Sequence, residues 1–570
     1  MTRPGGRVAK FDSIIKGGMI FDGARNPRYI GDIGIKGGLI AEIGKLSSSD
    51  AEQVLDAAGM HVAPGFIDLH THYDGQIFWD PYCSISSWHG CTSLVIGNCG
   101  FGLAPVIPAL RDRIMLSLTR NEAIPLAAMQ AGIPWDWETY PEYLASLDRT
   151  PKSVNLLPYV GLTPLLIWVM GLERAKAGEL PTEAEHAEMR RLLHEAMEAG
   201  ACGWSVQRMA KEINMQRDFD GTPLPTDVMH DVTAFELAEV LGERNDGFMQ
   251  MTIATLDQKA DRVHVEKLAE ISRRPVIWNA LAVISELPVH RDVMAWLTDV
   301  RERGLRVYGQ STTTEAPMFF TFEDWNLWDD SPAWREATLG TVEERLAKLR
   351  DPEIREAMRR KPTMAGASGP IADVVLLRTS QAGDKQYENL KIRDICQLTG
   401  KDEIDAILDI ACADGLEALF YAEPFKNHRE WERELVDYQY GLAGVSDGGA
   451  HTKFFTAGRY PTEYLTKWVR DLAWVQLEEA HWRLSAFPAY CAGFTDRGIL
   501  KVGAPADIVV YDYANLEVLP PEVAYDMPAG EWRRVQRARG YRYVLVNGQV
   551  TIEDDKETGV NSGRLLRHGS

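Results

Sequence analysis

The chain has 570 residues and a mass of 63.8 kDa, too long for one simple core, so we expect two or three structural units. Its formal charge of −21 argues against nucleic acid and anionic membrane surfaces as partners, because the electrostatic contribution to both would be repulsive. The seven cysteines form no CxxC pair and are odd in number, which predicts free thiols in a reducing, cytoplasmic setting. We expect neither a secretory signal nor a membrane span, because no apolar run approaches the roughly 18 residues that a span needs.

Both ends of the chain predict small β-structure. Residues 11–62 contain short apolar runs around Gly-Gly and Asp-Gly pairs, which are hairpin signals. Residues 500–555 show the same pattern of short apolar runs and turn-forming pairs, including an Asn-Gly turn. We therefore expect one small β-sandwich built from residues 1–62 and 496–570, around a different middle.

The middle of the chain, residues 63–495, alternates apolar strand candidates with amphipathic helices about eight times. This pattern implies a parallel sheet in an α/β fold, and closure as a (β/α)₈ TIM-type barrel is the natural solution. The segment from about 312 to 364 is rich in Trp and Phe and breaks the alternation. Two interpretations stay open for it: an insertion over the barrel mouth that acts as a lid, or a long loop packed into the core.

The stretch APGFIDLHTHYDGQ, residues 63–76, ends an apolar run with two histidines. Residues i and i+2 of a strand share a face, so Asp68, His70 and His72 point the same way. If GFIDL is the first barrel strand, both imidazoles point into the mouth, where sites of this fold are built. Neutral imidazole is the commonest metal ligand, so the pair predicts a metal site, with two packing histidines as the alternative.

The same stretch resembles the first-strand signature of the amidohydrolase superfamily, whose members are metal-dependent hydrolases with a (β/α)₈ barrel beside a small β-sandwich. Other stretches are similar to the D-aminoacylase (N-acyl-D-amino-acid deacylase) branch, appear in family order and cover nearly the whole chain. They are VIGNCGFGLAP at 95–105, GACGWS at 200–205, GVSDGGAH at 444–451, and DRGILKVGAPADIVVYD and YVLVNGQV nearer the C-terminus.

This resemblance implies roles for five residues. His70 and His72 correspond to the first-strand metal ligands, and Cys99 matches the cysteine that this branch uses as a ligand. Asp447 matches the last-strand aspartate, which implies a metal ligand and the catalytic acid and base. Arg459 aligns with the arginine that binds the substrate carboxylate, a task that suits a guanidinium fork. By the residues alone, Cys99 would be a packed thiol and Asp447 a turn residue.

Three positions depart from the family pattern. The family supplies two more metal histidines, from the fifth and sixth strands, where this chain has Asn279 and Gln310. Thr252 replaces the histidine of the stretch after the fourth strand. Amides are poor zinc ligands compared with imidazole, so we expect one zinc ion and leave a second open. We expect Asn279 and Gln310 to bind substrate, by orienting its carbonyl or stabilising an oxyanion.

Three other histidines could complete the coordination: His89, His230 and His451, with packing or surface roles as the alternative for each.

Together with the metal-binding residues, this resemblance implies a metal-dependent hydrolase that cleaves an amide C–N bond in a small-molecule substrate. The resemblance implies an N-acyl amino acid or a related carboxylate-bearing amide. Zinc would supply a water of lowered pKa, and Asp447 would accept its proton and deliver it to the leaving nitrogen. One alternative keeps the site and cleaves a lactone, ester, carbamate or cyclic amide, or decarboxylates an acid. Another is a non-catalytic scaffold of the same fold. Whether the chain forms a homo-oligomer is left open.

Overall fold

A computed structural model describes most of the chain. The described residues are 9–211, 216–283, 287–315, 317–323, 331–360, 370–424 and 428–568. Within these ranges, no helix is both long enough and apolar enough to cross a membrane. Residues 316, 324–330 and 361–364 of the predicted insertion lie outside them.

Both ends of the chain meet in one nine-stranded sheet, as expected. Its order is β25-β24-β23-β18-β5-β1-β2-β3, with β4 also paired to β1. The strands are β1 (Phe11–Ile20), β2 (Tyr29–Lys36), β3 (Leu39–Gly44), β4 (Ala51–Asp56), β5 (His61–Pro64), β18 (Ile508–Tyr511), β23 (Tyr541–Val546), β24 (Gln549–Glu553) and β25 (Lys556–Glu557). Strand β5 joins the two ends, because Val62 is paired with Ile20 on one side and with Val510 on the other. A β-sandwich built from both ends fits this sheet.

The middle of the chain contributes parallel strands in two sheets, ordered β6-β7-β8 and β9-β10-β11-β12-β13-β17. Their bounds are β6 (Phe66–Asp68), β7 (Cys91–Ile96), β8 (Asn155–Pro158), β9 (Val160–Gly161), β10 (Gly203–Arg208), β11 (Phe248–Ile253), β12 (Val276–Leu281), β13 (Val307–Ser311) and β17 (Gly441–Ala443). These strands do not close into one hydrogen-bonded ring. The outer strands β6 and β17 have three residues each, and the described chain joins them only by an isolated bridge between Thr71 and Gly448.

Helices follow most of these strands and bury one face against them. They include α1 (Arg111–Glu122), α3 (Tyr140–Arg149), α4 (Leu162–Met170), α6 (Glu183–Ala199), α7 (Asp231–Arg244), α8 (Gln258–Ser272), α9 (Val289–Glu302), α15 (Arg429–Asp437), α16 (Tyr460–Glu463), α17 (Leu477–His481) and α18 (Phe487–Ala492). Helix α6 illustrates why they form: Thr182 and Glu185 make a capping box at its start, and Gly200 ends it in the left-handed conformation. Its buried Met189 and Leu193 lie four residues apart, on one face.

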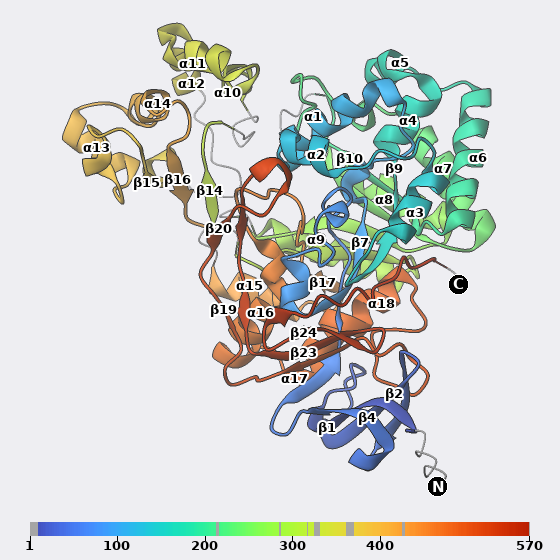
Figure 1. Cartoon of the computed structure of the whole chain (residues 1–570). Helices are drawn as coiled ribbons and strands as arrows, with labels where there is room; N and C mark the ends of the chain where they lie inside the picture. The colour runs from blue at the N-terminus through green and yellow to red at the C-terminus, as the bar shows by residue number, and fades with distance from the viewer. Residues whose placement is uncertain are drawn as a thin grey trace.

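A separate lobe interrupts the alternation and is longer than the predicted insertion. In Figure 1 it lies at the upper left, apart from the helices that flank the parallel strands. It contains β14 (Met318–Phe320), α10 (Pro332–Thr338), α11 (Val342–Arg350), α12 (Pro352–Arg360), β15 (Val375–Arg378), α13 (Ile392–Thr399), α14 (Glu403–Ala413) and β16 (Leu419–Ala422). Strand β16 pairs with both β14 and β15, and the lobe has its own apolar core around Phe320, Ile407 and Phe420.

The strand order corrects the strand numbers that the sequence analysis gave for Asn279 and Gln310. With β8 and β9 counted together, β11 is the fifth, β12 the sixth and β13 the seventh of the described parallel strands. Thr252 therefore lies on the fifth strand and Asn279 on the sixth, while Gln310 lies on the seventh. The sequence analysis placed Asn279 and Gln310 one strand too early in the order.

Candidate metal centre and active site

Four predicted residues meet at the carboxyl ends of the parallel strands. Ligand atoms of His70, His72 and Cys99 all lie within 4.8 Å of one another, and the three residues are buried. The Oδ1 atom of Asp447 is 3.1 Å from Nε2 of His70 and 3.6 Å from Nε2 of His72. The structure thus gathers the histidine pair, the thiol and the carboxylate into one cluster.

The backbone after β6 places both imidazoles on one side. Thr71, between the two histidines, donates its N–H to Val95 at 3.2 Å and forms the bridge to Gly448. The N–H of His72 then donates to the Gly448 carbonyl at 2.6 Å. The segment therefore lies between the loops after the second and the last strands. Because extended residues alternate in direction, His70 and His72 face the same space.

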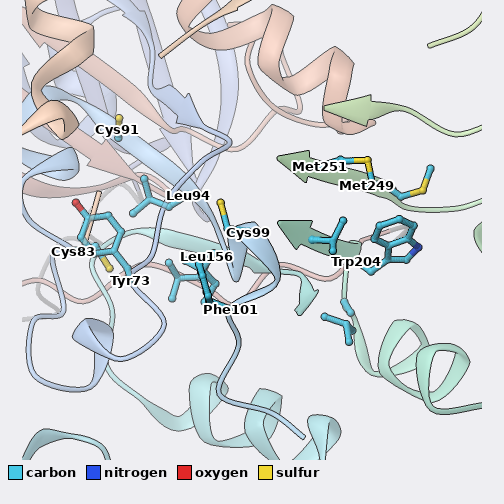
Figure 2. Close-up of a cluster of buried hydrophobic side chains, with 14 of the residues drawn as sticks. Tyr73, Cys83, Cys91, Leu94, Cys99, Phe101, Leu156, Trp204, Met249 and Met251 are labelled. Atoms are coloured by element: carbon cyan, nitrogen blue, oxygen red, sulfur yellow. The ribbon is translucent and has the colours of Figure 1, made fainter. Parts of the chain in front are cut away.

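Cys99 and Asp447 both occupy the left-handed backbone region. Their φ values are 57° and 45°, and such conformations cost a non-glycine residue on the order of 1–3 kcal/mol and cluster at functional sites. The N–H of Cys99 donates to Oε1 of Gln250 at 2.7 Å, which helps to hold this turn after β7. Figure 2 shows Cys99 in a buried cluster that also contains Leu94 and Met251.

Three distances within the cluster are close to those between the ligands of a tetrahedral zinc ion. Zn–N bonds of about 2.0–2.1 Å and Zn–S bonds of about 2.3 Å put neighbouring N and S ligands about 3.5 Å apart. The distance from Nε2 of His70 to Sγ of Cys99 is 3.5 Å. The two distances from Asp447 to the imidazoles bracket the ~3.4 Å expected between N and O ligands. His70, Cys99 and Asp447 are therefore spaced as ligands of one zinc ion, and His72 lies close enough to join them.

Charges within the cluster compensate one another. Burial lowers the pKa of His70, but Cys99 and Asp447 beside it raise that pKa to about 10. Burial raises the pKa of the Cys99 thiol, and the two histidines reverse this and lower it below its ordinary value. The pKa of Asp447 lies well below its usual range, because hydrogen bonds to His70 and His72 outweigh burial. The anionic forms of the thiol and the carboxylate, which bind metals, are the favoured ones.

The residues that replace the family's histidines contact the cluster directly. Nδ1 of His70 lies 2.5 Å from Nδ2 of Asn279 and 3.2 Å from Oε1 of Gln310. The hydroxyl of Thr252 is 3.4 Å from Sγ of Cys99. These side chains surround the ligands rather than adding imidazoles. In the part of the chain that the structure describes, no further histidine joins the metal cluster.

Two residues of the site were not predicted from the sequence. Glu122, the last residue of α1, is buried, with Oε1 4.0 Å from Nδ1 of His72 and Oε2 3.5 Å from Nε2 of His451. Nothing in its local sequence indicates this position. The sequence could have indicated Gln250 as a site residue. Gln250 and Thr252 are alternate polar residues of the apolar strand β11, so their side chains share a face.

The other histidine candidates lie outside the metal cluster. His451 contacts Glu122, as described above. His89 is buried, with Nδ1 2.8 Å from the Thr462 hydroxyl and Nε2 3.0 Å from the Gln536 carbonyl. His230 is exposed at the start of α7, with Nε2 3.0 Å from the Gly178 carbonyl.

A cavity of about 740 Å³ borders Asp447, whose side chain is 23% exposed. Its wall combines the ends of the parallel strands, the α15 region, the segment after Asp447 and the lobe. The described lining residues are Val283, Thr312, Thr313, Thr314, Glu315, Met318, Tyr421, Glu423, Pro424, Arg429, Glu432, Leu435, Val436, Val445, Asp447, Phe455, Ala457, Lys467 and Trp468. A small molecule in this cavity would lie directly beside the metal cluster.

Arg459 is buried behind this wall. It is not one of the described lining residues, and its Nε atom lies 3.0 Å from Oε2 of Glu463. Burial raises the pKa of Glu463, and the Arg459 guanidinium opposes that shift.

A family model described as "Amidohydrolase family" matches residues 53–552, so this chain belongs to the amidohydrolase family. A D-aminoacylase of Alcaligenes xylosoxydans xylosoxydans is 26% identical over 577 residues, covering 98% of this chain and 97% of that protein. An N-acyl-D-aspartate deacylase of the same organism is 27% identical, covering 98% of this chain and 96% of that protein. An uncharacterised protein of Mycobacterium tuberculosis is 28% identical with the same coverage.

Solved structures agree with the fold. A D-aminoacylase structure has a TM-score of 0.66 at 21% identity, covering 98% of this chain and 100% of that one. An N-acyl-D-glutamate deacylase from Bordetella bronchiseptica, complexed with zinc and a phosphonate inhibitor, has a TM-score of 0.67 at 23% identity with the same coverage.

Proposed function

We propose that this chain hydrolyses an amide C–N bond with one zinc ion held by His70, His72, Cys99 and Asp447. The observation that carries this proposal is the convergence of these four side chains into one cluster, of which Asp447 lines a cavity of about 740 Å³. The zinc in the Bordetella deacylase structure supports the choice of metal. The proposal includes closure of the parallel strands as a (β/α)₈ barrel around this site.

Each residue of the site would have a distinct role in this reaction. Zinc, when bound, would polarise the substrate carbonyl and lower the pKa of an attacking water. Asp447 accepts the proton of that water and delivers it to the leaving nitrogen, which suits its place between the histidines and the cavity. Asn279 and Gln310 hold His70 in orientation, and we propose that they also face the substrate carbonyl.

The substrate class follows from the relatives. Two relatives are named as deacylases of N-acyl-D-aspartate and N-acyl-D-glutamate, so we propose an N-acyl amino acid or a related amide, with Arg459 as the candidate partner of a carboxylate. Residues of the lobe, including Met318 and Tyr421, line the cavity, which supports a lid role for this region.

The test is a substrate panel with zinc-loaded protein. N-acyl-D-amino acids, N-acyl-L-amino acids and neutral acyl amides would be compared with lactones, esters and carbamates, with release of amine or acid measured. We expect zinc-dependent turnover of at least one amide and none after removal of the metal. Turnover confined to esters or lactones would contradict the amide assignment. Less than about a tenth of an equivalent of bound metal would favour the scaffold instead.

A further inference from the structure

Arg459 has a protein acceptor for each of its three side-chain nitrogens. Nε pairs with Glu463, and Nη1 donates to the carbonyl and the hydroxyl of Thr456 at 3.1 and 3.3 Å. Nη2 donates to the backbone carbonyl of Glu315. Glu463 also accepts the N–H of Glu315 at 3.0 Å, so the ion pair fixes the loop of residues 312–315 at the cavity wall. A cation on the wall itself is better placed than Arg459 to touch a ligand.

Arg429 is such a cation. It is the first residue of α15, and its exposed side chain lines the cavity. Among the residues that the structure describes, none forms a hydrogen bond or an ion pair with its guanidinium. Burial raises the pKa of Glu432, one turn further along the helix, and the Arg429 charge opposes that shift without reversing it. The N–H donors of Arg429 are therefore available to a ligand in the cavity.

Lys467 is the other cation among the described lining residues. Its Nζ atom lies 2.6 Å from Oε1 of Glu315 and 4.0 Å from the centre of the Trp468 ring. An anion that bound Lys467 would compete with both contacts. On the described wall, Arg429 is therefore the cation that can bind a carboxylate without losing a hydrogen bond or an ion pair to the protein. Its planar fork also matches the two oxygens of a carboxylate, whereas a lysine ammonium is a point charge.

The rest of the wall suits the other parts of an N-acyl amino acid. Asp447 joins the cavity to the metal cluster, and apolar side chains, including Met318 and Trp468, line it. We propose that Arg429 binds a carboxylate of the substrate directly, while the scissile amide lies beside Asp447. This inference rests on the proposed hydrolysis of an N-acyl amino acid and adds a residue that determines its specificity. Arg459 supports the same site by holding the loop at the wall.

The carboxylate is that of the α-carbon or of an acidic side chain, and paired probes distinguish the two. N-acetylleucine and N-acetylleucinamide differ in the α-carboxylate, and N-acetylglutamate and N-acetylglutamine differ in the side-chain carboxylate. Calorimetry with zinc-loaded full-length protein gives the Kd of each probe, as both enantiomers. We expect Arg429→Gln to raise the Kd of the carboxylate probe of one pair at least ~10-fold and to leave its neutral counterpart unchanged, because a charge-assisted fork is lost. Weakening of N-acetylleucine assigns the α-carboxylate, and weakening of N-acetylglutamate beyond that of N-acetylglutamine assigns the side chain.

Two further variants sharpen the result. Arg433→Gln, at an arginine one turn along the same helix that pairs with Asp437, should change no Kd. Arg429→Lys keeps the charge without the fork and should restore part of the affinity. Equal Kd values in Arg429→Gln and wild type for every carboxylate probe would overturn the inference, and so would the absence of binding by all of them.

Failure of this inference can be told apart from failure of the proposed function, because acetate release is measured in the same samples. Binding that depends on Arg429 without turnover in any zinc-loaded protein would contradict only the hydrolysis. Turnover of an N-acyl amino acid with equal Kd and kcat/KM in wild type and Arg429→Gln would contradict only the role of Arg429.

Discussion

Nε2 of His70 lies 3.1 Å from Oδ1 of Asp447, which joins the first and the last of the parallel strands at one point. The hydroxyl of Ser446 reinforces this junction by donating to the His70 carbonyl at 2.8 Å. Asp447 is also the member of the cluster that borders the cavity. It is therefore the residue at which proton transfer and metal binding can be separated by mutation.

Replacing Asp447 with Asn should lower kcat by about 10²–10⁴-fold, because the amide cannot accept the proton of the attacking water. Zinc should remain bound, since His70, His72 and Cys99 still provide three ligands. Steady-state kinetics and elemental analysis of the same preparation check both points. Asp437→Asn, at the exposed end of α15, is the control. Wild-type turnover in zinc-replete Asp447→Asn would refute the acid and base role.

Replacing Cys99 with Ser should weaken zinc binding at least ~10-fold, because a hydroxyl is a much poorer zinc ligand than a thiolate. Competition with a chelator measures the affinity. In cobalt-substituted protein the variant should also lose the sulfur-to-cobalt charge-transfer absorption. Cys396→Ser, at a partly exposed cysteine of the lobe, should change neither signal. A charge-transfer band that persists in Cys99→Ser would place the sulfur ligand elsewhere.

Replacing Glu122 with Gln should weaken zinc binding about 10–100-fold, the usual effect of removing a carboxylate that orients a metal-binding histidine. Glu122 faces Nδ1 of His72, and Nε2 of that ring faces Asp447. The control is Asp112→Asn, an exposed acid in the first turn of the same helix. Equal zinc affinity in Glu122→Gln and wild type would show that His72 needs no such partner.

Stability should fall in mild acid partly through His481. Burial lowers the pKa of this histidine to about 3, and its Nε2 lies 2.8 Å from the Tyr511 hydroxyl. The unfolded chain, with an ordinary pKa near 6.5, therefore binds a proton that the folded chain does not. Between pH 6.5 and 4, this histidine should reduce the free energy of unfolding by about 1.4 kcal/mol for each unit that the pH falls.

Denaturant unfolding at several pH values measures this slope. His481→Gln should be less stable at neutral pH but should show a shallower loss in acid than the wild type. His230→Gln, at an exposed histidine, should leave the slope as it is. If His481→Gln kept the full wild-type slope, the acid sensitivity would come from other groups.

Local sequence patterns predicted much of the fold. The hairpin signals at both ends correspond to strands of one sheet, and the apolar stretches of the middle correspond to parallel strands. Closure into a ring stays a prediction, because β6 and β17 have three residues each and an isolated bridge is what joins them in the described chain. The lobe was underestimated, because its second half, with α13 and α14, contains helices with ordinary amphipathic patterns.

The sequence by itself determined which residue types were available for a site: an HxH after an apolar strand, a cysteine after the next strand and an aspartate after the last. These are local features, since strand alternation and turn chemistry act over a few residues. Only the tertiary structure decided that Glu122 faces His72 and that Glu463 forms an ion pair with Arg459. Both contacts depend on side chains brought together by packing, and the charge on a residue says nothing of the neighbour that will compensate it.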